Sequence, residues 1–168
     1  MKMSGQILAG SLGRARDYSG HHELSIKPGY RPDLSELEGF TLDGLTSESF
    51  NSKLRYISLH KCDNLIGLLG YSNGNCETGH SYWMGLIEIK PNERNNHYGS
   101  LLLKNFFEHA AKNEIPSVSS EIMKVSYPKI SSSLNRFKEE GLIREYDTND
   151  PFGDYCFSDR VPVDIRLI

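Results

Sequence analysis

The sequence predicts an α/β (α+β) fold with a mixed, mainly antiparallel sheet flanked by helices. Three strand-like segments follow one another between Leu54 and Ile89 and are separated by short polar turns. A strongly amphipathic segment begins near Tyr98 and has the period of a helix. A further apolar strand at 117–125 and a second helical segment complete an order that is typical of a sheet covered by helices.

Length and composition set the class of protein. The chain has 168 residues, and we expect 1–168 to form one domain, with an atypical part at 1–53, a core at 54–142 and strands at 143–168. The net charge is −3 and no basic stripe is visible, so we do not expect nucleic-acid binding. No apolar run is long enough for a membrane span or a secretory signal, so we expect no membrane contact.

The cysteines and histidines predict a reducing environment and no metal site. Cys62, Cys76 and Cys156 are widely spaced and odd in number, which is typical of free thiols in a cytoplasmic protein. The adjacent His21 and His22 lie in a polar stretch and are interpreted as solvated surface.

Residues Ser4 to Asn51 are weakly patterned. The segment 22–26 alternates polar and apolar residues and predicts a short strand, and 27–32 is a turn with two prolines. Leu34, Leu37 and Phe40 predict one or two helical turns capped by Asp33 or Ser35, with a second helical candidate at 46–51.

The pattern sharpens from Leu54 onward. We predict strands at 54–60, 65–71 and 81–89, with a hairpin turn at 61–64 and a turn cluster at 72–75. The helix that follows Gly99 has an apolar stripe made of Leu102, Leu103, Phe106, Phe107, Ala110 and Ala111.

The C-terminal third continues this order. The strand at 117–125 should run parallel to the strand at 81–89 across a helical crossover. A second helix begins near Pro128, carries Ile130, Leu134 and Phe137 on one face and ends at Gly141, and further strands are expected at 155–157 and 161–168.

The connection between Ile89 and the helix predicts an anion site. It contains Pro91, Asn92, Asn95, Asn96 and Gly99, residue types that favour turns. A helix start offers backbone N–H groups and the positive end of the helix dipole, which together suit a phosphate or pyrophosphate. Gly99 would let a ligand approach the backbone because it has no Cβ.

The segment Arg94-Asn95-Asn96-His97-Tyr98-Gly99-Ser100, preceded by Ile89-x-Pro91, resembles motif A of the GCN5-related N-acetyltransferases (GNAT), Arg/Gln-x-x-Gly-x-Gly/Ala. Arg94 and Gly99 match the motif, and His97 stands where its first Gly is usual. The resemblance extends over 54–142, where Phe137-x-x-x-Gly141-Leu142 is similar to a Tyr-x-x-x-Gly-Phe signature of the family. A purely structural turn remains the alternative interpretation.

The resemblance implies that acetyl-coenzyme A is the co-substrate and that 54–142 is the cofactor-binding core, with a sheet splayed where the cofactor enters. The pyrophosphate is then expected on the Arg94 side chain and the 96–100 backbone, and the pantetheine arm on Ile87 and Ile89. The cofactor-binding residues so implied are Ile87, Ile89, Arg94, Asn95, Asn96, His97, Tyr98, Gly99 and Ser100.

The function so implied is N-acetyl transfer from acetyl-CoA to an amine of a small molecule or a protein. The alternative is a catalytically degenerate GNAT-fold module that binds a protein. A nucleic-acid-binding factor would need the basic residues at Lys124, Lys129, Arg136 and Lys138, which Glu139 and Glu140 dilute. The sequence leaves the acceptor and the oligomeric state open.

Glu88 is the leading candidate for the general base, because it is the one carboxylate in an apolar strand next to the motif. Its alternative is an edge-of-sheet charge that reaches solvent or pairs with Lys90 or Arg94. Tyr82 and Glu121 are the further catalytic candidates, and His80 precedes the strand.

The acid that protonates the leaving thiolate is a separate question. In the family that acid is often a Tyr at the position that Phe137 takes here, so Tyr127, Cys156 or water would have to supply the proton.

Overall fold

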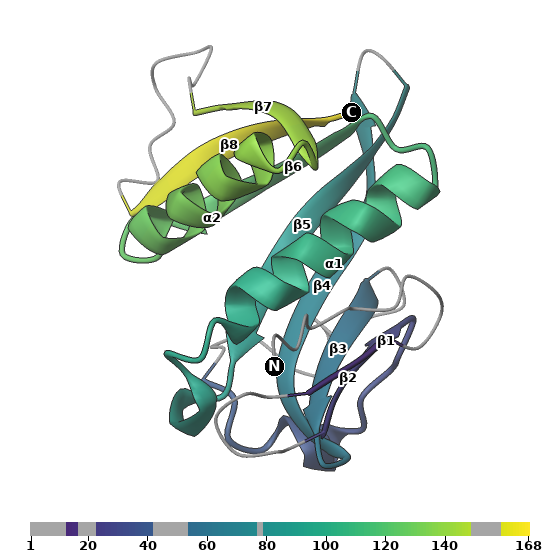
Figure 1. Ribbon diagram of the computed structural model, residues 1–168, viewed down its shortest axis with the longest axis vertical. Helices are drawn as coiled ribbons and strands as arrows, with labels where there is room; N and C mark the ends of the chain where they lie inside the picture. Colours follow the sequence, from purple (N-terminus) through teal and green to yellow (C-terminus); the bar gives the residue numbers. More distant parts are fainter. Residues whose placement is uncertain (1–12, 17–22, 42–53, 77–78, 149–158) are drawn as a thin grey trace, which may run out of the picture. The chain divides into compact units, whose positions relative to one another are not determined.

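The structure, a computed structural model, describes residues 13–16, 23–41, 54–76, 79–148 and 159–168. Its elements in chain order are β1 (Gly13–Arg16), β2 (Glu23–Pro28), the 3-10 helix η1 (Leu34–Leu37), β3 (Arg55–Lys61), β4 (Asn64–Cys76), β5 (Gly79–Ile89), the 3-10 helix η2 (Pro91–Glu93), α1 (Tyr98–Lys112), β6 (Ser117–Met123), α2 (Tyr127–Glu139), β7 (Ile143–Asp147) and β8 (Arg160–Leu167) (Figure 1).

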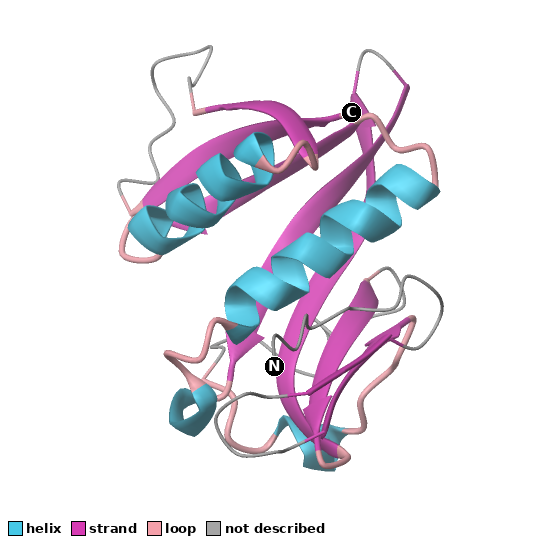
Figure 2. Ribbon diagram, viewed as in Figure 1, coloured by secondary structure: helices cyan, strands magenta, loops and turns pink. Residues whose placement is uncertain are grey.

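The strands of the described part form one mixed sheet, which confirms the predicted fold class (Figure 2). The hydrogen-bonded order is β1-β2-β3-β4-β5-β6-β8-β7. The pair β5–β6 is parallel, as the predicted helical crossover requires, whereas β1–β2, β2–β3, β6–β8 and β7–β8 are antiparallel. Within the described residues β5 and β6 pair at Tyr82–Met84 and 118–120.

The chain divides into two compact units. The first contains residues 1–70 and 86–102, and the second contains residues 71–85 and 103–168. The expectation of a single domain stays a prediction.

The first unit is built on the strands of the N-terminal half. Tyr56 and Leu68 form a buried cluster, and four partly buried apolar side chains pack against it: Leu37, Phe40, Leu54 and Leu86. The predicted hairpin turn at 61–64 is confirmed, because Cys62 and Asp63 both have positive φ (48° and 65°), as a two-residue turn between antiparallel strands requires. Asp33 is the N-cap of η1 and forms a capping box with Glu36.

The second unit buries the apolar faces of both helices. Phe106 and Phe107 of α1 are fully buried, as are Leu134 and Phe137 of α2. The rings of Phe107 and Phe137 meet edge to face with centroids 6.0 Å apart. The predicted stripe of α1 is therefore buried except at Ala111, which is exposed, and on the predicted face of α2 Ile130 is only half-buried. Neither described helix is long and apolar enough to cross a membrane.

The predicted turn cluster at 72–75 is wrong, because β4 continues as a strand to Cys76. A Cβ on Gly74 would lie 2.8 Å from Oγ of Ser81, so this glycine serves the close approach of β4 and β5. The strand β1 was not predicted. The helical candidate at 46–51 and the strand expected at 155–157 lie outside the described residues.

Candidate functional site

The turn that joins β5 to α1 contains two left-handed backbone positions. β5 ends at Ile89, η2 follows at 91–93, and α1 begins at Tyr98. Asn95 and His97 have φ values of 65° and 61°. A glycine adopts this conformation without a steric cost, and Asn and His adopt it less readily. His97 therefore occupies a position whose backbone favours glycine.

The N-terminus of α1 presents backbone N–H groups and the positive end of the helix dipole. The first helical hydrogen bond runs from the N–H of Leu101 to the carbonyl of His97 (3.1 Å), so the N–H groups of Tyr98, Gly99 and Ser100 precede it. The first turn carries no acidic side chain that would compensate the helix dipole. A Cβ on Gly99 would meet one atom within 4 Å, Cγ1 of Ile89 at 4.0 Å, so the backbone beside Gly99 is approachable.

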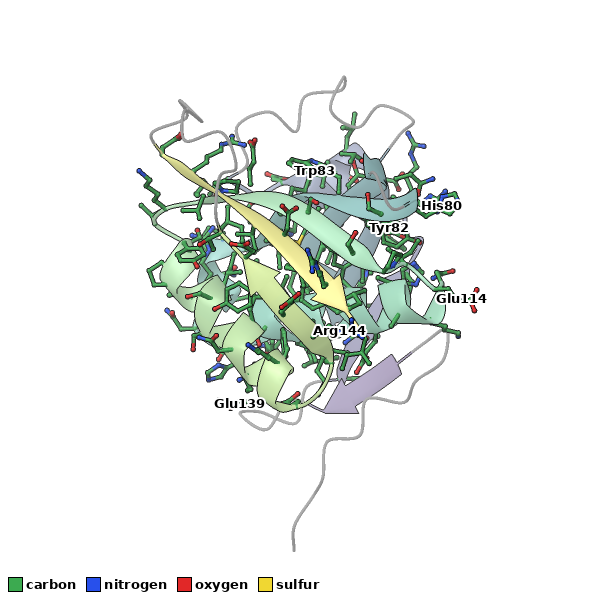
Figure 3. All side chains as sticks on the ribbon, turned by 90° about the horizontal axis from the view of Figure 1, so that it is seen from above. His80, Tyr82, Trp83, Glu114, Glu139 and Arg144 are labelled. Carbon is green, nitrogen blue, oxygen red and sulfur yellow. The ribbon has the colours of Figure 1, made fainter. Side chains whose placement is uncertain are left out.

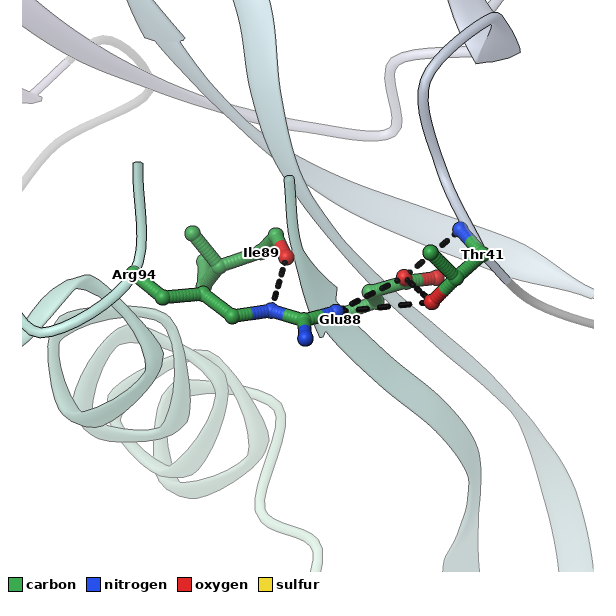
Figure 4. A network of polar contacts seen from close by, with 4 residues as sticks. All are labelled: Thr41, Glu88, Ile89 and Arg94. Carbon is green, nitrogen blue, oxygen red and sulfur yellow. Dashed lines mark hydrogen bonds and ion pairs between the residues drawn. The ribbon is translucent and has the colours of Figure 1, made fainter. Parts of the chain in front are cut away.

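The side chain of Arg94 lies back along β5 (Figure 4). Its Nε donates to the carbonyl of Ile89 (2.9 Å), and its Nη2 donates to Oε1 of Glu88 (3.2 Å) and to Oγ1 of Thr41 (3.4 Å). The Ile89 carbonyl is thus already used within the turn, and the Arg94 guanidinium joins the turn to the end of β5 and to Thr41.

Glu88 is buried although it carries a carboxylate, with only 6% of its side chain exposed. Oε1 accepts from Thr41 through both the backbone N–H (2.8 Å) and the hydroxyl, in addition to Arg94. Oε2 is buried and has no hydrogen-bond partner among the described residues. The ion pair with Arg94, one of the two alternatives for Glu88, is therefore present in the structure.

Sequence reasoning missed Thr41. It lies in the weakly patterned first part of the chain, and a single Thr after an apolar residue carries no local signal for a contact 47 residues away.

Comparison with known proteins identifies the fold. No model of a protein family matches the sequence, and no curated protein matches it. The structure is similar to an acetyltransferase of Bacillus subtilis solved in complex with CoA, at 14% identity and a TM-score of 0.60, over 86% of this chain and 99% of the other. It is also similar to a GNAT family acetyltransferase of Elizabethkingia anophelis with acetyl-CoA bound, at 14% identity and a TM-score of 0.57, over 86% and 98% of the two chains. Tetrahymena GCN5 matches at 12% identity and a TM-score of 0.50, over 71% of each chain.

This chain has the GNAT fold. At these identities the likeness shows the fold and leaves activity to be argued from the residues.

The three catalytic candidates are divided between the two units of this GNAT-fold chain. Glu88 belongs to the first unit, whereas Tyr82 and Glu121 belong to the second. Tyr82 is buried, and its ring stacks on Phe106 and His109, with centroids 6.1 and 6.3 Å apart. His80, which Figure 3 labels together with Tyr82, is an exposed residue within β5, whereas we expected it to precede the strand.

Glu121 has a partner on the neighbouring strand. Its Oε2 lies 3.7 Å from Nη1 of Arg160, and 16% of its side chain is exposed. Such a pair is worth little in stability when one partner is half exposed, so Glu121 is not committed to a structural role.

Beside Tyr82, a polar pair lies within the aromatic cluster. The hydroxyl of Tyr71 and Nε2 of His109 are 2.9 Å apart, and the Tyr71 ring lies 4.9 Å from that of Tyr82. These contacts hold the Tyr82 ring within a cluster of aromatic side chains.

Phe137 lies in the core, with 1% of its surface exposed. It contacts Phe107, and the guanidinium of Arg136 lies over its ring at 5.4 Å. Of the residues considered as alternative proton donors, Tyr127 is half-buried at the first position of α2, and Cys156 lies outside the described residues.

The basic residues of α2 are partly engaged with carboxylates. Arg136 lies 3.9 Å from Glu140, which also pairs with Lys104 at 3.3 Å. Such i,i+4 and inter-helix pairs are typical of a solvated helical surface.

Proposed function

We propose that this chain is an acyl-CoA-dependent N-acyltransferase, which moves an acetyl group from acetyl-CoA to an amine. The observation that carries the proposal is the approachable backbone at Gly99 in the first turn of α1, placed after a strand and a turn in the GNAT fold. The first turn of α1 has no acidic residue, and Gly99 has no Cβ. Such a helix start suits a negatively charged group such as the pyrophosphate of acetyl-CoA.

The residues present fit this ligand at the turn. The N–H groups at 98–100 precede the first helical hydrogen bond and point along the positive end of the dipole. Asn96 supports the turn, since its Nδ2 donates to the carbonyls of Glu93 (3.2 Å) and Arg94 (3.4 Å). We therefore propose that the backbone at 96–100 holds the pyrophosphate and that Ile87 offers backbone groups to the pantetheine arm.

Acetyl-CoA would supply the thioester carbonyl that is attacked. A bond from the amine nitrogen to the acyl carbon forms, the carbon–sulfur bond breaks, the amine loses a proton to a base, and the thiolate takes one up. The chain contributes by holding both substrates, which alone can supply a large part of the rate.

Glu88 is proposed as the base, with Tyr82 and Glu121 as the further candidates. The support for Glu88 is its Oε2, the oxygen that is buried and lacks a partner among the described residues. A buried polar atom without a partner is costly, and it marks a place where a water or a substrate donor would be stabilised.

Calorimetry with acetyl-CoA tests the proposed function. We expect binding by the parent protein and by Gly99→Ala, because an added methyl group meets only Ile89 at van der Waals distance. Gly99→Glu should abolish binding through bulk and charge while thermal unfolding stays near that of Gly99→Ala. The absence of heat and of any thermal shift at millimolar acetyl-CoA would sink the proposal and favour a degenerate protein-binding module.

A further inference from the structure

We propose that Arg94 and Thr41 are positioning residues for the cofactor site: through Glu88 they hold the turn that presents the backbone N–H groups of α1. The inference rests on the proposed function and goes beyond it, because it assigns Arg94 to the turn rather than to the pyrophosphate. It also gives a role to a residue from the weakly patterned part of the chain.

The turn needs support from outside itself. Asn95 and His97 both have left-handed backbone conformations, and each such position costs on the order of 1 kcal/mol or more for a residue other than glycine. Strained positions of this kind persist when the surrounding contacts over-determine them. Arg94 and Glu93, on the N-terminal side of the turn, make contacts of this kind.

Arg94 joins the turn to the strand through two separate groups. Nε donates to the Ile89 carbonyl at 2.9 Å, while Nη2 donates to Glu88 at 3.2 Å, so one planar guanidinium spans two consecutive residues of β5. A lysine ammonium has the charge but not this pair of separated donors. A second tie comes from Lys61 of β3, whose Nζ lies 3.1 Å from Oε2 of Glu93.

Thr41 also anchors the carboxylate of Glu88. Its N–H and hydroxyl both donate to Oε1, the same oxygen that accepts from Arg94. The segment before it also contacts the end of β5, since Lys90 Nζ lies 5.2 Å from the centre of the Phe40 ring and a Cβ on Gly39 would be 3.8 Å from Lys90. The 39–41 segment is thus docked along 88–90, where it fixes the Glu88 carboxylate.

The two oxygens of Glu88 then have different tasks. Oε1 accepts the donors that anchor the turn, and Oε2 stays unpartnered among the described residues. A Gln at this position keeps a carbonyl oxygen for the anchor and removes the carboxylate, so the anchoring role and the base role separate experimentally.

The test measures the affinity for acetyl-CoA by calorimetry in four variants and a control. Arg94→Lys and Thr41→Val should each weaken binding by about three- to tenfold, the range expected for the loss of one net hydrogen bond. Thr41→Ser keeps the hydroxyl and should restore parental affinity, and Glu88→Gln should bind within about twofold of the parent. Thr148→Val, a Thr outside this network at the end of β7, is the matched control.

A kinetic readout separates positioning from a general loss of structure. With any accepted amine, Arg94→Lys and Thr41→Val should raise KM for acetyl-CoA and leave kcat at saturating acetyl-CoA within about twofold. Parental affinity in Arg94→Lys would overturn the proposal, as would an equal loss in Thr41→Ser and Thr41→Val. If the parent protein itself binds no acetyl-CoA, the proposed function fails and this inference fails with it, whereas tight parental binding with an unaffected Arg94→Lys removes this inference alone.

Discussion

The backbone N–H of Thr41 donates a 2.8 Å hydrogen bond to Oε1 of Glu88, which lies 47 residues further along the chain. The hydroxyl of Thr41 donates to the same oxygen, and the ion pair with Arg94 completes its set of donors. This contact ties a segment without clear local pattern to the end of the strand that precedes the proposed cofactor site.

Glu88→Gln tests the proposed role of Glu88 as the general base. A positioned base contributes on the order of a hundred- to ten-thousand-fold, so turnover should fall within that range while acetyl-CoA affinity stays nearly parental. Steady-state kinetics with an amine found by screening small molecules and N-terminal peptides is the measurement.

Glu121→Gln and Tyr82→Phe are the matched controls for that experiment. Full activity of Glu88→Gln together with a loss in one control would move the base to that residue. If all three variants keep full activity, positioning of the substrates carries the reaction.

His97→Gly should stabilise the protein. The backbone of His97 has a φ of 61°, a conformation in which a residue with a Cβ is strained by about 1 kcal/mol or more. The gain is partly offset by the greater freedom of glycine in the unfolded chain, so we expect a net increase in the free energy of unfolding of about 0.5–1 kcal/mol. His97→Ala keeps the strain and removes the imidazole, and a gain of the same size in that variant, measured by urea unfolding, would refute the strain argument.

Phe137→Tyr should not create a better enzyme. The ring is buried against Phe107, so an added hydroxyl would enter the core and cost about 1–3 kcal/mol if it found no partner. We expect a lower thermal midpoint and no rise in kcat. A faster variant would instead show that the ring edge reaches the leaving group.

His60 should make the protein less stable in mild acid. It is buried in β3 with Nε2 at 2.9 Å from Oγ of Ser58, and burial, assisted by the charge of Lys27, lowers the pKa of His60. Because the folded-state pKa lies below the unfolded value of about 6.5, the unfolded chain binds the proton first as the pH falls. Stability is therefore greatest above about pH 6.5 and decreases as the pH is lowered below it.

Urea unfolding of the parent and of His60→Gln between pH 7 and pH 5 measures this effect. The decrease in stability with falling pH should be smaller in the variant than in the parent. The hydrogen bond from Tyr30 lowers the pKa of the neighbouring Glu36. The stability that Glu36 contributes is therefore lost only below about pH 4.5, outside the range between pH 7 and pH 5. An identical slope in the two proteins would exclude His60 as the source.

The sequence alone determined the order of elements from 54 to 142 and the place of the turn at Gly99. Alternation in a strand and the apolar stripe of α1 are properties of neighbouring residues, so they can be read without the fold. The same local reasoning failed at 72–75, where polar residues and Gly74 resemble a turn but lie in β4, because a close strand neighbour at Ser81 was not visible in the sequence.

Only the tertiary structure decided what the functional side chains touch. From the sequence, Glu88 could be a base or a charge paired with Lys90 or Arg94. In the fold it forms an ion pair with Arg94 and accepts a hydrogen bond from Thr41. The fold also placed Phe137 in the core. Partners that lie far apart in the sequence are brought together by the packing of whole elements, and no local propensity at either residue records that contact.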